Sequence, residues 1–220
     1  RTIIKNQFRK NIAIFNFNNN SIDSSLCWLQ TGLSHLIFFD LSQDIYINTK
    51  SIYSFLENIR EADFSPHQEL PLTLMLKMAK ESHLNYLVTG QFQKTNTLFS
   101  VTTLIYEVNS ANKIAEHSYT GKNLLDIIDT ITIQLKKDLH IPKKHIETVK
   151  DLPVSAISTS SSPALKKFIL GLNARYINNN YAKSIHYHKK AIFIDPNFTI
   201  AWIELSATYA QSSQITKYHK

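Results

Sequence analysis

Hydrophobic and polar positions alternate near the start of the chain, over residues 11–17. This period of two predicts a β-strand, with Ile12, Ile14 and Asn16 on one face and the residues between them on the other. The polar stretch 18–21 ends the strand as a loop. Leucines and isoleucines then recur every three or four residues up to Ile37, which predicts one face of a helix.

The same analysis continues to about residue 150. Strands are predicted at residues 45–48, 86–93, 98–108 and 114–120, and helices at 71–83 and 124–139. Residues 52–59 are helical or irregular, and residues 63–69, which contain Pro66, form a loop. The last three strands form an antiparallel meander with one wet face. The expected fold class is α+β over residues 1–150: a mixed α/β sheet domain with flanking helices.

Composition changes after this domain. Pro153, a run of serines and threonine, and Pro163 directly after it mark residues 151–162 as a linker or extended connector. The pattern after it is purely helical, with predicted helices at 164–177, 181–194 and 198–211. An asparagine turn, Asn178–Asn180, separates the first two helices, and Asp195-Pro196 ends the second. Residues 163–220 therefore form an all-α region.

These helices match a tetratricopeptide pattern, in which small residues lie where paired helices cross and large residues fill the space between them. The predicted repeat-packing positions are Gly171, Tyr181, Ser184, Ala191, Pro196, Trp202, Leu205 and Tyr209. His188 stands where a large apolar residue is usual. Gly171 and Tyr176 are one residue out of step, so we expect one extra residue in the asparagine turn.

About one and a half repeats are present. A single helical hairpin cannot bury its own apolar face, and about three stacked repeats are usually needed. Either further repeats continue the array or the α/β domain covers the exposed face. Because the chain begins with Arg1 and ends within a repeat, we expect a truncated array and a piece of a longer protein.

Charge and cysteine content narrow the classes of protein. The net charge is +7 and the pI about 9.3, but the basic residues are scattered and indicate solvated faces. We therefore expect no direct nucleic-acid contact. The single cysteine, Cys27, excludes an internal disulfide and indicates a buried small hydrophobe. No run of about 18 apolar residues occurs, so membrane contact is expected only through flanking segments absent from this chain.

No motif for catalysis or cofactor binding occurs. The nine histidines form no HExxH or CxxC-type cluster, and there is no phosphate loop or GxSxG. His186 and His188 are two residues apart and do not face each other on a helix. Asp126, Asp129 and Asp138 fit the polar side of a helix. We predict no catalytic, cofactor-binding or metal residues and expect this segment not to be an enzyme.

Several stretches together resemble the TolB amino-terminal-domain-like family. Residues 12–19 resemble its first strand, with Asn16 in place of the usual proline, and Thr31-Gly32-Leu33 matches its first helix. Residues 83–90 resemble its "Gly-Val-Asp-Tyr-Leu-Leu-x-Gly" strand, and Leu104-Ile105-Tyr106 a later one. The order and spacing carry the resemblance, which covers about nine tenths of the chain.

The resemblance implies a bacterial, non-catalytic sensory, regulatory and interaction module. Such regions accompany serine/threonine kinases, adenylate cyclases and ToxR, CadC and HilA-type regulators, so the full-length protein would carry the effector domain. The alternative is a tetratricopeptide scaffold or an envelope-associated assembly protein without signalling output. Under both, the partner is a protein or peptide bound through the repeat region, or a second copy. The compartment, periplasmic or cytoplasmic, stays open.

Overall fold

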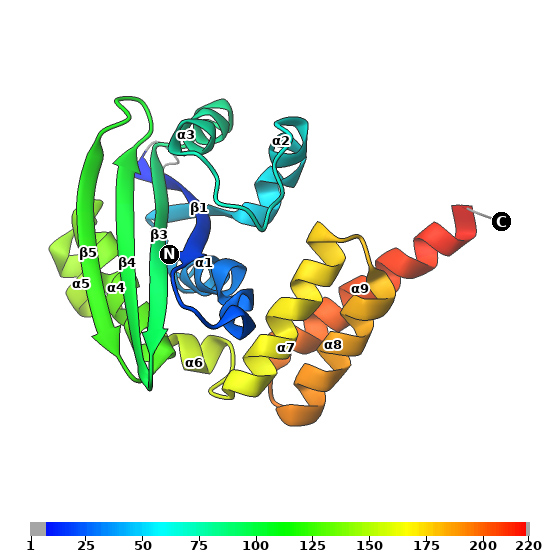
Figure 1. Cartoon of the computed structure of the whole chain (residues 1–220). Helices are drawn as coiled ribbons and strands as arrows, with labels where there is room; N and C mark the ends of the chain where they lie inside the picture. The colour runs from blue at the N-terminus through cyan, green and yellow to red at the C-terminus, as the bar shows by residue number, and fades with distance from the viewer. Residues whose placement is uncertain (1–7, 219–220) are drawn as a thin grey trace. The chain divides into compact units, whose positions relative to one another are not determined.

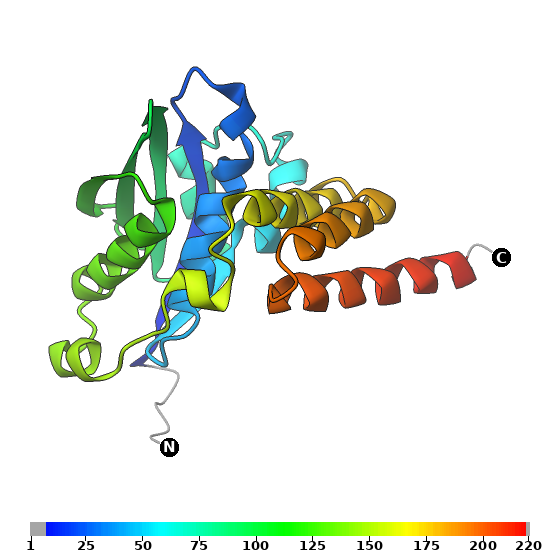
Figure 2. The same cartoon turned by 90° about the horizontal axis from the view of Figure 1, so that it is seen from below.

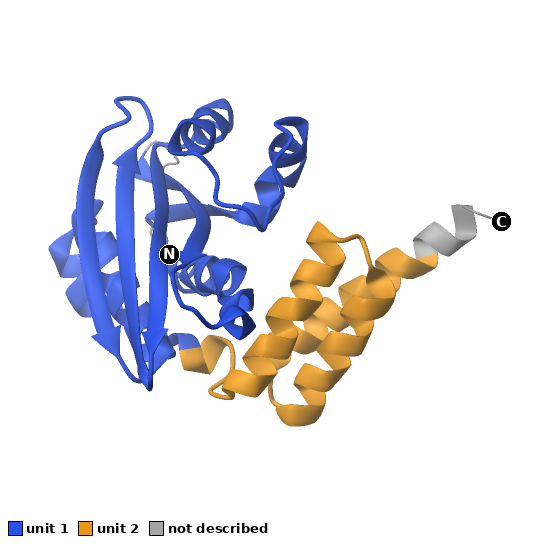
Figure 3. Ribbon diagram, viewed as in Figure 1, with its two compact units in different colours: residues 1–154 blue, residues 155–220 orange. Residues whose placement is uncertain are grey.

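The computed structural model describes residues 8–218, and the side chains up to Ser213. The chain divides into two compact units, residues 1–154 and 155–220 (Figure 3). Each unit is described by itself below.

The first unit is built on a five-stranded sheet in the order β2-β1-β3-β4-β5 (Figure 1). The strands are β1 (Lys10–Asn19), β2 (Ile47–Ser51), β3 (Tyr86–Thr95), β4 (Leu98–Glu107) and β5 (Lys113–Gly121). The central strand β1 runs parallel to β2 and β3, whereas β3, β4 and β5 form the predicted antiparallel meander. The coarse mixed α/β class is therefore confirmed.

Helices connect and cover these strands (Figures 1 and 2). They are η2 (Ser24–Leu26), α1 (Trp28–Leu41), η3 (Ile52–Phe55), α2 (Leu56–Glu61), α3 (Leu72–Glu81), α4 (Leu124–Asp138) and α5 (Lys143–Thr148). The side chains of Asp23 and Asn123 cap η2 and α4 by accepting backbone N–H groups. Helix α5 was not predicted, because its six residues carry too short a pattern to show a period.

The core on one side of the sheet joins β1 to α2 and α3. Ala13 and Phe15 lie in one buried cluster with Phe55, Ile59 and Met78. The rings of Phe15 and Phe55 stack with centroids 4.9 Å apart. Helices α1 and α4 contact each other as well as the sheet. The alternation of β1 therefore buries both of its faces, as expected of a central strand.

The predicted linker is partly helical. Residues 154–157 form a short helix, α6 (Val154–Ile157), at the boundary between the units. The sequence prediction of a connector over 151–162 rested on Pro153 and the serine run, and these residues cap helices as readily as they extend the chain. Ser161 caps the next helix by accepting the N–H of Ala164.

The second unit is all-α. It contains α7 (Ser162–Leu172), a π-helical turn η4 (Asn173–Ile177), α8 (Tyr181–Ile194) and α9 (Thr199–Tyr218). Helix α7 packs against α8, and α8 against α9. The one-residue offset predicted for the asparagine turn lies instead in η4. A π-helical turn inserts one extra residue into a helix, which is the irregularity that the sequence pattern registered.

None of the helices in the described part of the chain is both long and apolar enough to cross a bilayer.

Candidate functional site

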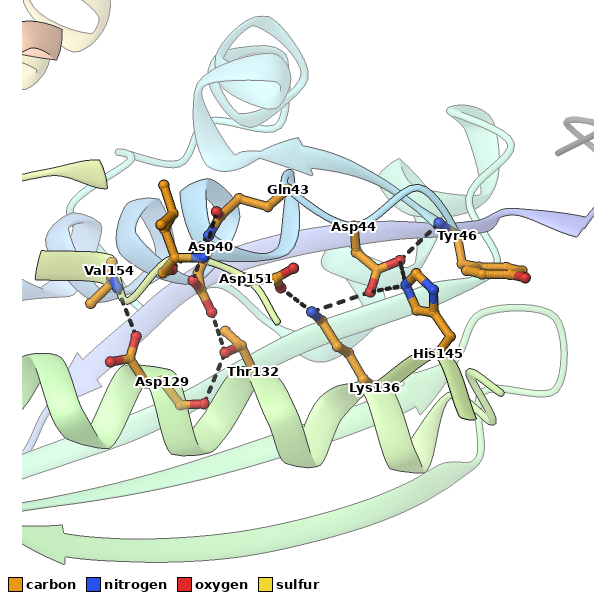
Figure 4. A network of polar contacts seen from close by, with 11 residues as sticks. Asp40, Gln43, Asp44, Tyr46, Asp129, Thr132, Lys136, His145, Asp151 and Val154 are labelled. Carbon is orange, nitrogen blue, oxygen red and sulfur yellow. Dashed lines mark hydrogen bonds and ion pairs between the residues drawn. The ribbon is translucent and has the colours of Figure 1, made fainter. Parts of the chain in front are cut away.

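A network of buried charges lies where α1 ends and α4 and α5 approach it (Figure 4). Lys136 of α4 is at its centre: its Nζ is 3.2 Å from Oδ2 of Asp44 and also pairs with Asp151. Asp44 Oδ1 lies 3.2 Å from Nε2 of His145 on α5 and accepts the backbone N–H of Tyr46. The carboxylate of Asp44 and the ammonium of Lys136 thus join the end of α1 to α4 and α5.

A second set of polar contacts continues this network toward residue 152. Asp40, in the last turn of α1, accepts hydrogen bonds from Thr132 Oγ1 and from Nε2 of Gln43. The Gln43 side chain also donates to the carbonyl of Leu152 and accepts its N–H, at 3.0 and 3.1 Å. These two bonds tie the backbone of Leu152 to the side chain of Gln43.

Burial and neighbouring charges together set the protonation states of Asp40 and Lys136. It raises the pKa of Asp40 to about 6; Thr132 opposes the shift, and the nearby carboxylates Asp129 and Asp151 add to it. For Lys136, burial alone would lower the pKa, but its ion pairs with Asp151 and Asp44 outweigh burial and raise it. Lys136 is therefore charged at neutral pH, and Asp40 titrates close to neutrality.

A cavity of about 310 Å³ adjoins this network. Asp40, Asp129 and Lys136 are among its polar lining residues, and residues 149–153 form one wall. Asp129 is already engaged, because its Oδ1 accepts the backbone N–H of Val154 at 2.8 Å. Asp40, Asp129 and Lys136 are thus already paired with other groups of the protein. Their arrangement suits a clamp that fixes residues 149–154, and it presents no activated nucleophile.

No group of three histidine, cysteine, aspartate or glutamate side chains within the described residues is placed to hold a metal ion. Cys27, expected to be buried, is exposed at the start of α1. It lies between a 3-10 turn and a helix, where its neighbours Leu26 and Trp28 take the buried positions.

The structure places the predicted repeat-packing residues in two groups. Gly171, Ser184, Ala191 and Leu205 are buried in the helical unit. A methyl group on Gly171 would lie 2.5 Å from Cε1 of His188, so the two helices meet where a glycine faces a ring. The hydroxyl oxygens of Ser184 and Thr208 are 3.4 Å apart and join α8 to α9.

The other predicted packing residues lie nearer the surface. Tyr181 is half-buried at the start of α8, and Pro196 is exposed where α8 ends. Trp202 and Tyr209 are exposed and are not buried between helices of this unit, so their role in packing against a further repeat stays a prediction. The Trp202 indole donates to the carbonyl of Pro196 at 3.0 Å.

Large apolar side chains stay exposed in the helical unit. Phe193 is 88% exposed, Ile203 59% and Trp202 50%, and Ile194 and Tyr209 are also exposed. We call these five exposed residues together the apolar surface of α8 and α9, a name for the set of exposed side chains on the two helices. Residues 202 and 209 are seven apart and therefore lie on the same side of α9.

Comparisons with known proteins find no matching family model and no matching curated protein. Solved structures with a similar fold include the LpoB C-terminal domain from Salmonella enterica, which is 10% identical, with a TM-score of 0.45 over 51% of this chain and 82% of that one. TolB from Acinetobacter baumannii is 18% identical, with a TM-score of 0.40 over 60% of this chain and 28% of TolB. Lipoprotein GNA1162 from Neisseria meningitidis is 9% identical, with a TM-score of 0.42 over 60% and 99% of the two chains.

TolB, whose amino-terminal-domain-like family the sequence was expected to resemble, is among these structures. With TM-scores below 0.5 and identities below 25%, these likenesses assign no function to this chain. The tetratricopeptide and signalling parts of the resemblance have no counterpart in the three matches.

Sequence analysis missed most of the charge network. It assigned Asp129 to the polar side of a helix and predicted no ion pair for Lys136 or His145. The partners Asp40, Asp44 and Asp151 come from other segments, 92 to 101 residues away for Thr132 and His145. Only the spacing of Lys136 on the buried stripe of α4, one residue after Leu135, signalled its burial.

Proposed function

We propose that this chain is a non-catalytic interaction module that holds a helical segment of a partner protein on the apolar surface of α8 and α9. The exposure of Phe193, Trp202 and Ile203 carries the proposal, because several large apolar side chains exposed on two packed helices can together form a patch of the kind that marks contact sites. Aromatic anchors contribute a large share of binding energy at such contacts.

The helical architecture indicates the kind of partner. Helical repeats stack so that the apolar stripe of one helix packs on the next pair, and an amphipathic helix placed on α9 would reproduce that packing. This role agrees with the tetratricopeptide identity, which is part of the proposal. It is an assembly or scaffold role, the alternative offered by the sequence.

The sensory and signalling role that the resemblance implies remains a second proposal. It needs an effector domain that these 220 residues do not encode, whereas the assembly role uses a surface that the chain displays. The buried, already paired charges of Lys136 and its partners also fit a binding module better than a reaction centre. We therefore favour the assembly role.

Site-specific photocrosslinking in the cells of origin tests it. A photoreactive amino acid at position 193 or 202 should crosslink one and the same protein. The same amino acid at Lys183, exposed in the first turn of α8, serves as the matched control and should not. Ile203→Glu should abolish the crosslink from position 202. The proposal is wrong if positions 193 and 202 give no crosslink beyond that of position 183, or if Ile203→Glu leaves it unchanged.

A further inference from the structure

A second cavity, of about 210 Å³, lies in the first unit, away from the charge network. It lies over the carboxyl-terminal half of β1, which pairs with β3 and extends beyond the residues of β1 that pair with β2. The chain leaves β1 toward β2 on one side and later returns to β3 on the other. Open α/β sheets bind ligands at such a switch of strand order, near the carboxyl ends of the strands.

A β-bulge brings Asn16 into this cavity. The register of β1 against β3 shifts between Ile14 and Phe17, and the alternation of side chains shifts with it. Asn16 was predicted on the face opposite Phe15, but it lines the cavity together with Met75, which belongs to the buried cluster of Phe15. The bulge therefore replaces an inward apolar position by an amide.

Hydrogen bonds hold Asn16 in place and leave one of its atoms unused. Its Nδ2 donates to the carbonyl of Pro66 at 2.7 Å, and its backbone carbonyl accepts the Thr89 hydroxyl at 2.9 Å. Its Oδ1 is buried and accepts no hydrogen bond from the described part of the protein. A buried carbonyl without a hydrogen bond costs about 1–3 kcal/mol of stability. A hydrogen-bond donor from outside the chain would therefore stabilise Asn16 Oδ1.

Other amides of the cavity are oriented in the same way. Gln68 Oε1 accepts the backbone N–H of Ser65 at 2.8 Å, and Gln91 Oε1 accepts from the Asn20 side chain at 3.0 Å. Both bonds use the amide oxygen and leave the two Nε2 donors for other acceptors. The wall thus offers two held amides, beside an acceptor on Asn16 that becomes accessible to a ligand once the side chains covering it shift.

The remaining lining sets the charge and size of the ligand. Glu69 is the one charged residue of the lining, which disfavours an anion. Leu70, Met75 and Leu104 give an apolar floor beside the amides. The volume falls below the roughly 300–1,000 Å³ of sites for drug-sized compounds. These properties fit a small neutral compound with several groups that both donate and accept.

We infer that this cavity binds a neutral polyhydroxylated compound of monosaccharide size, with Asn16 Oδ1 accepting one of its hydroxyl groups. Each hydroxyl is both donor and acceptor, so neighbouring hydroxyls satisfy Asn16 Oδ1 and the amide nitrogens of Gln68 and Gln91 together. The inference is independent of the proposed partner surface on α8 and α9, because the two features share no residues.

Nuclear magnetic resonance titration of the full chain tests the inference. The probes are glucose, N-acetylglucosamine and myo-inositol, with glucose 6-phosphate as the charged comparison, each raised to about 10 mM, ten times a Kd of 1 mM. At least one neutral probe should shift the amide signals of Asn16, Gly90 and Gln91 in a saturable way. Glucose 6-phosphate should bind at least tenfold more weakly than the neutral probe.

Variants separate this site from binding elsewhere. Asn16→Leu keeps the size of the side chain and should weaken binding at least tenfold; Gln91→Leu, at an exposed position that leaves folding intact, should also weaken it. Asn109→Leu, an exposed asparagine outside the cavity, is the matched control and should bind as the unmodified protein does. No saturable shift with any neutral probe overturns the inference, and so does binding that survives both cavity substitutions.

Discussion

The imidazole ring of His188 on α8 lies against the α-carbon of Gly171 on α7. An added methyl group at Gly171 would be 2.5 Å from Cε1 and 2.7 Å from Nδ1 of that ring. The ring is fully buried and also lies 5.5 Å, centroid to centroid, from the ring of Phe168. A small residue on one helix and an unusual histidine on the next are therefore two halves of one contact.

Gly171→Ala should destabilise the helical unit by about 1–3 kcal/mol, the cost of overpacking a buried contact. Replacing His188 by alanine should remove that cost, because the space of the ring is then free. In the His188→Ala background, Gly171→Ala should be neutral or stabilising, since alanine is the better helix former by about 1 kcal/mol. Urea unfolding of the four proteins of this double-mutant cycle gives the coupling energy. Additive effects of the two substitutions would contradict the contact.

Acid should destabilise the helical unit through His188. Burial, with a smaller effect of Arg175, lowers the pKa of His188 from 6.5 to about 4. Below pH 6.5 the unfolded chain binds a proton that the folded unit excludes until about pH 4, so stability is lost across that window as pH falls. The loss should reach about 2 kcal/mol at pH 5.

The measurement is the free energy of unfolding at pH 7 and pH 5, for the unmodified protein and for His188→Leu. Groups such as His35 and Asp40, whose pKa values are also shifted, titrate in both proteins and cancel in the difference. With Trp28 replaced by phenylalanine, fluorescence of Trp202 reports the helical unit alone. A difference that stays constant between the two pH values would show that His188 is protonated in the fold.

Local patterns predicted the long helices and strands with a clear hydrophobic period well. The strand prediction at 86–93 lies within β3, and the helix predicted at 181–194 has the same bounds as α8. Features that depend on partners far away in the sequence could not be predicted. The register shift that turns Asn16 over depends on how β1 meets β3, and the charge network depends on Asp44 meeting a lysine 92 residues later.

Trp202 illustrates the same limit. Its place in the repeat pattern predicted a buried ring, and a ring buried between helices would cost about 3–5 kcal/mol on truncation to alanine. The ring is half exposed, so we now expect Trp202→Ala to cost about 1 kcal/mol, in line with partly exposed positions. Thermal unfolding of the isolated chain measures this. A loss of 3 kcal/mol or more would mean that another part of the protein covers the ring.

Lys136→Met should destabilise the α/β unit by about 3–5 kcal/mol. The substitution keeps the length and apolar stem of the side chain but leaves the carboxylates of Asp44 and Asp151 buried without their shared cation. Lys143→Met is the matched control: its pair with Glu147 is on the same stretch of chain, but the two side chains are 88% and 60% exposed. Such surface pairs contribute little, so the control should change stability by less than about 0.5 kcal/mol. Urea unfolding followed by circular dichroism compares the two variants, and equal effects would show that the network at Lys136 is no more than a surface pairing.

If the network clamps residues 149–154, Lys136→Met should also speed amide hydrogen exchange at Leu152 and Val154, whose N–H groups bond to Gln43 and Asp129.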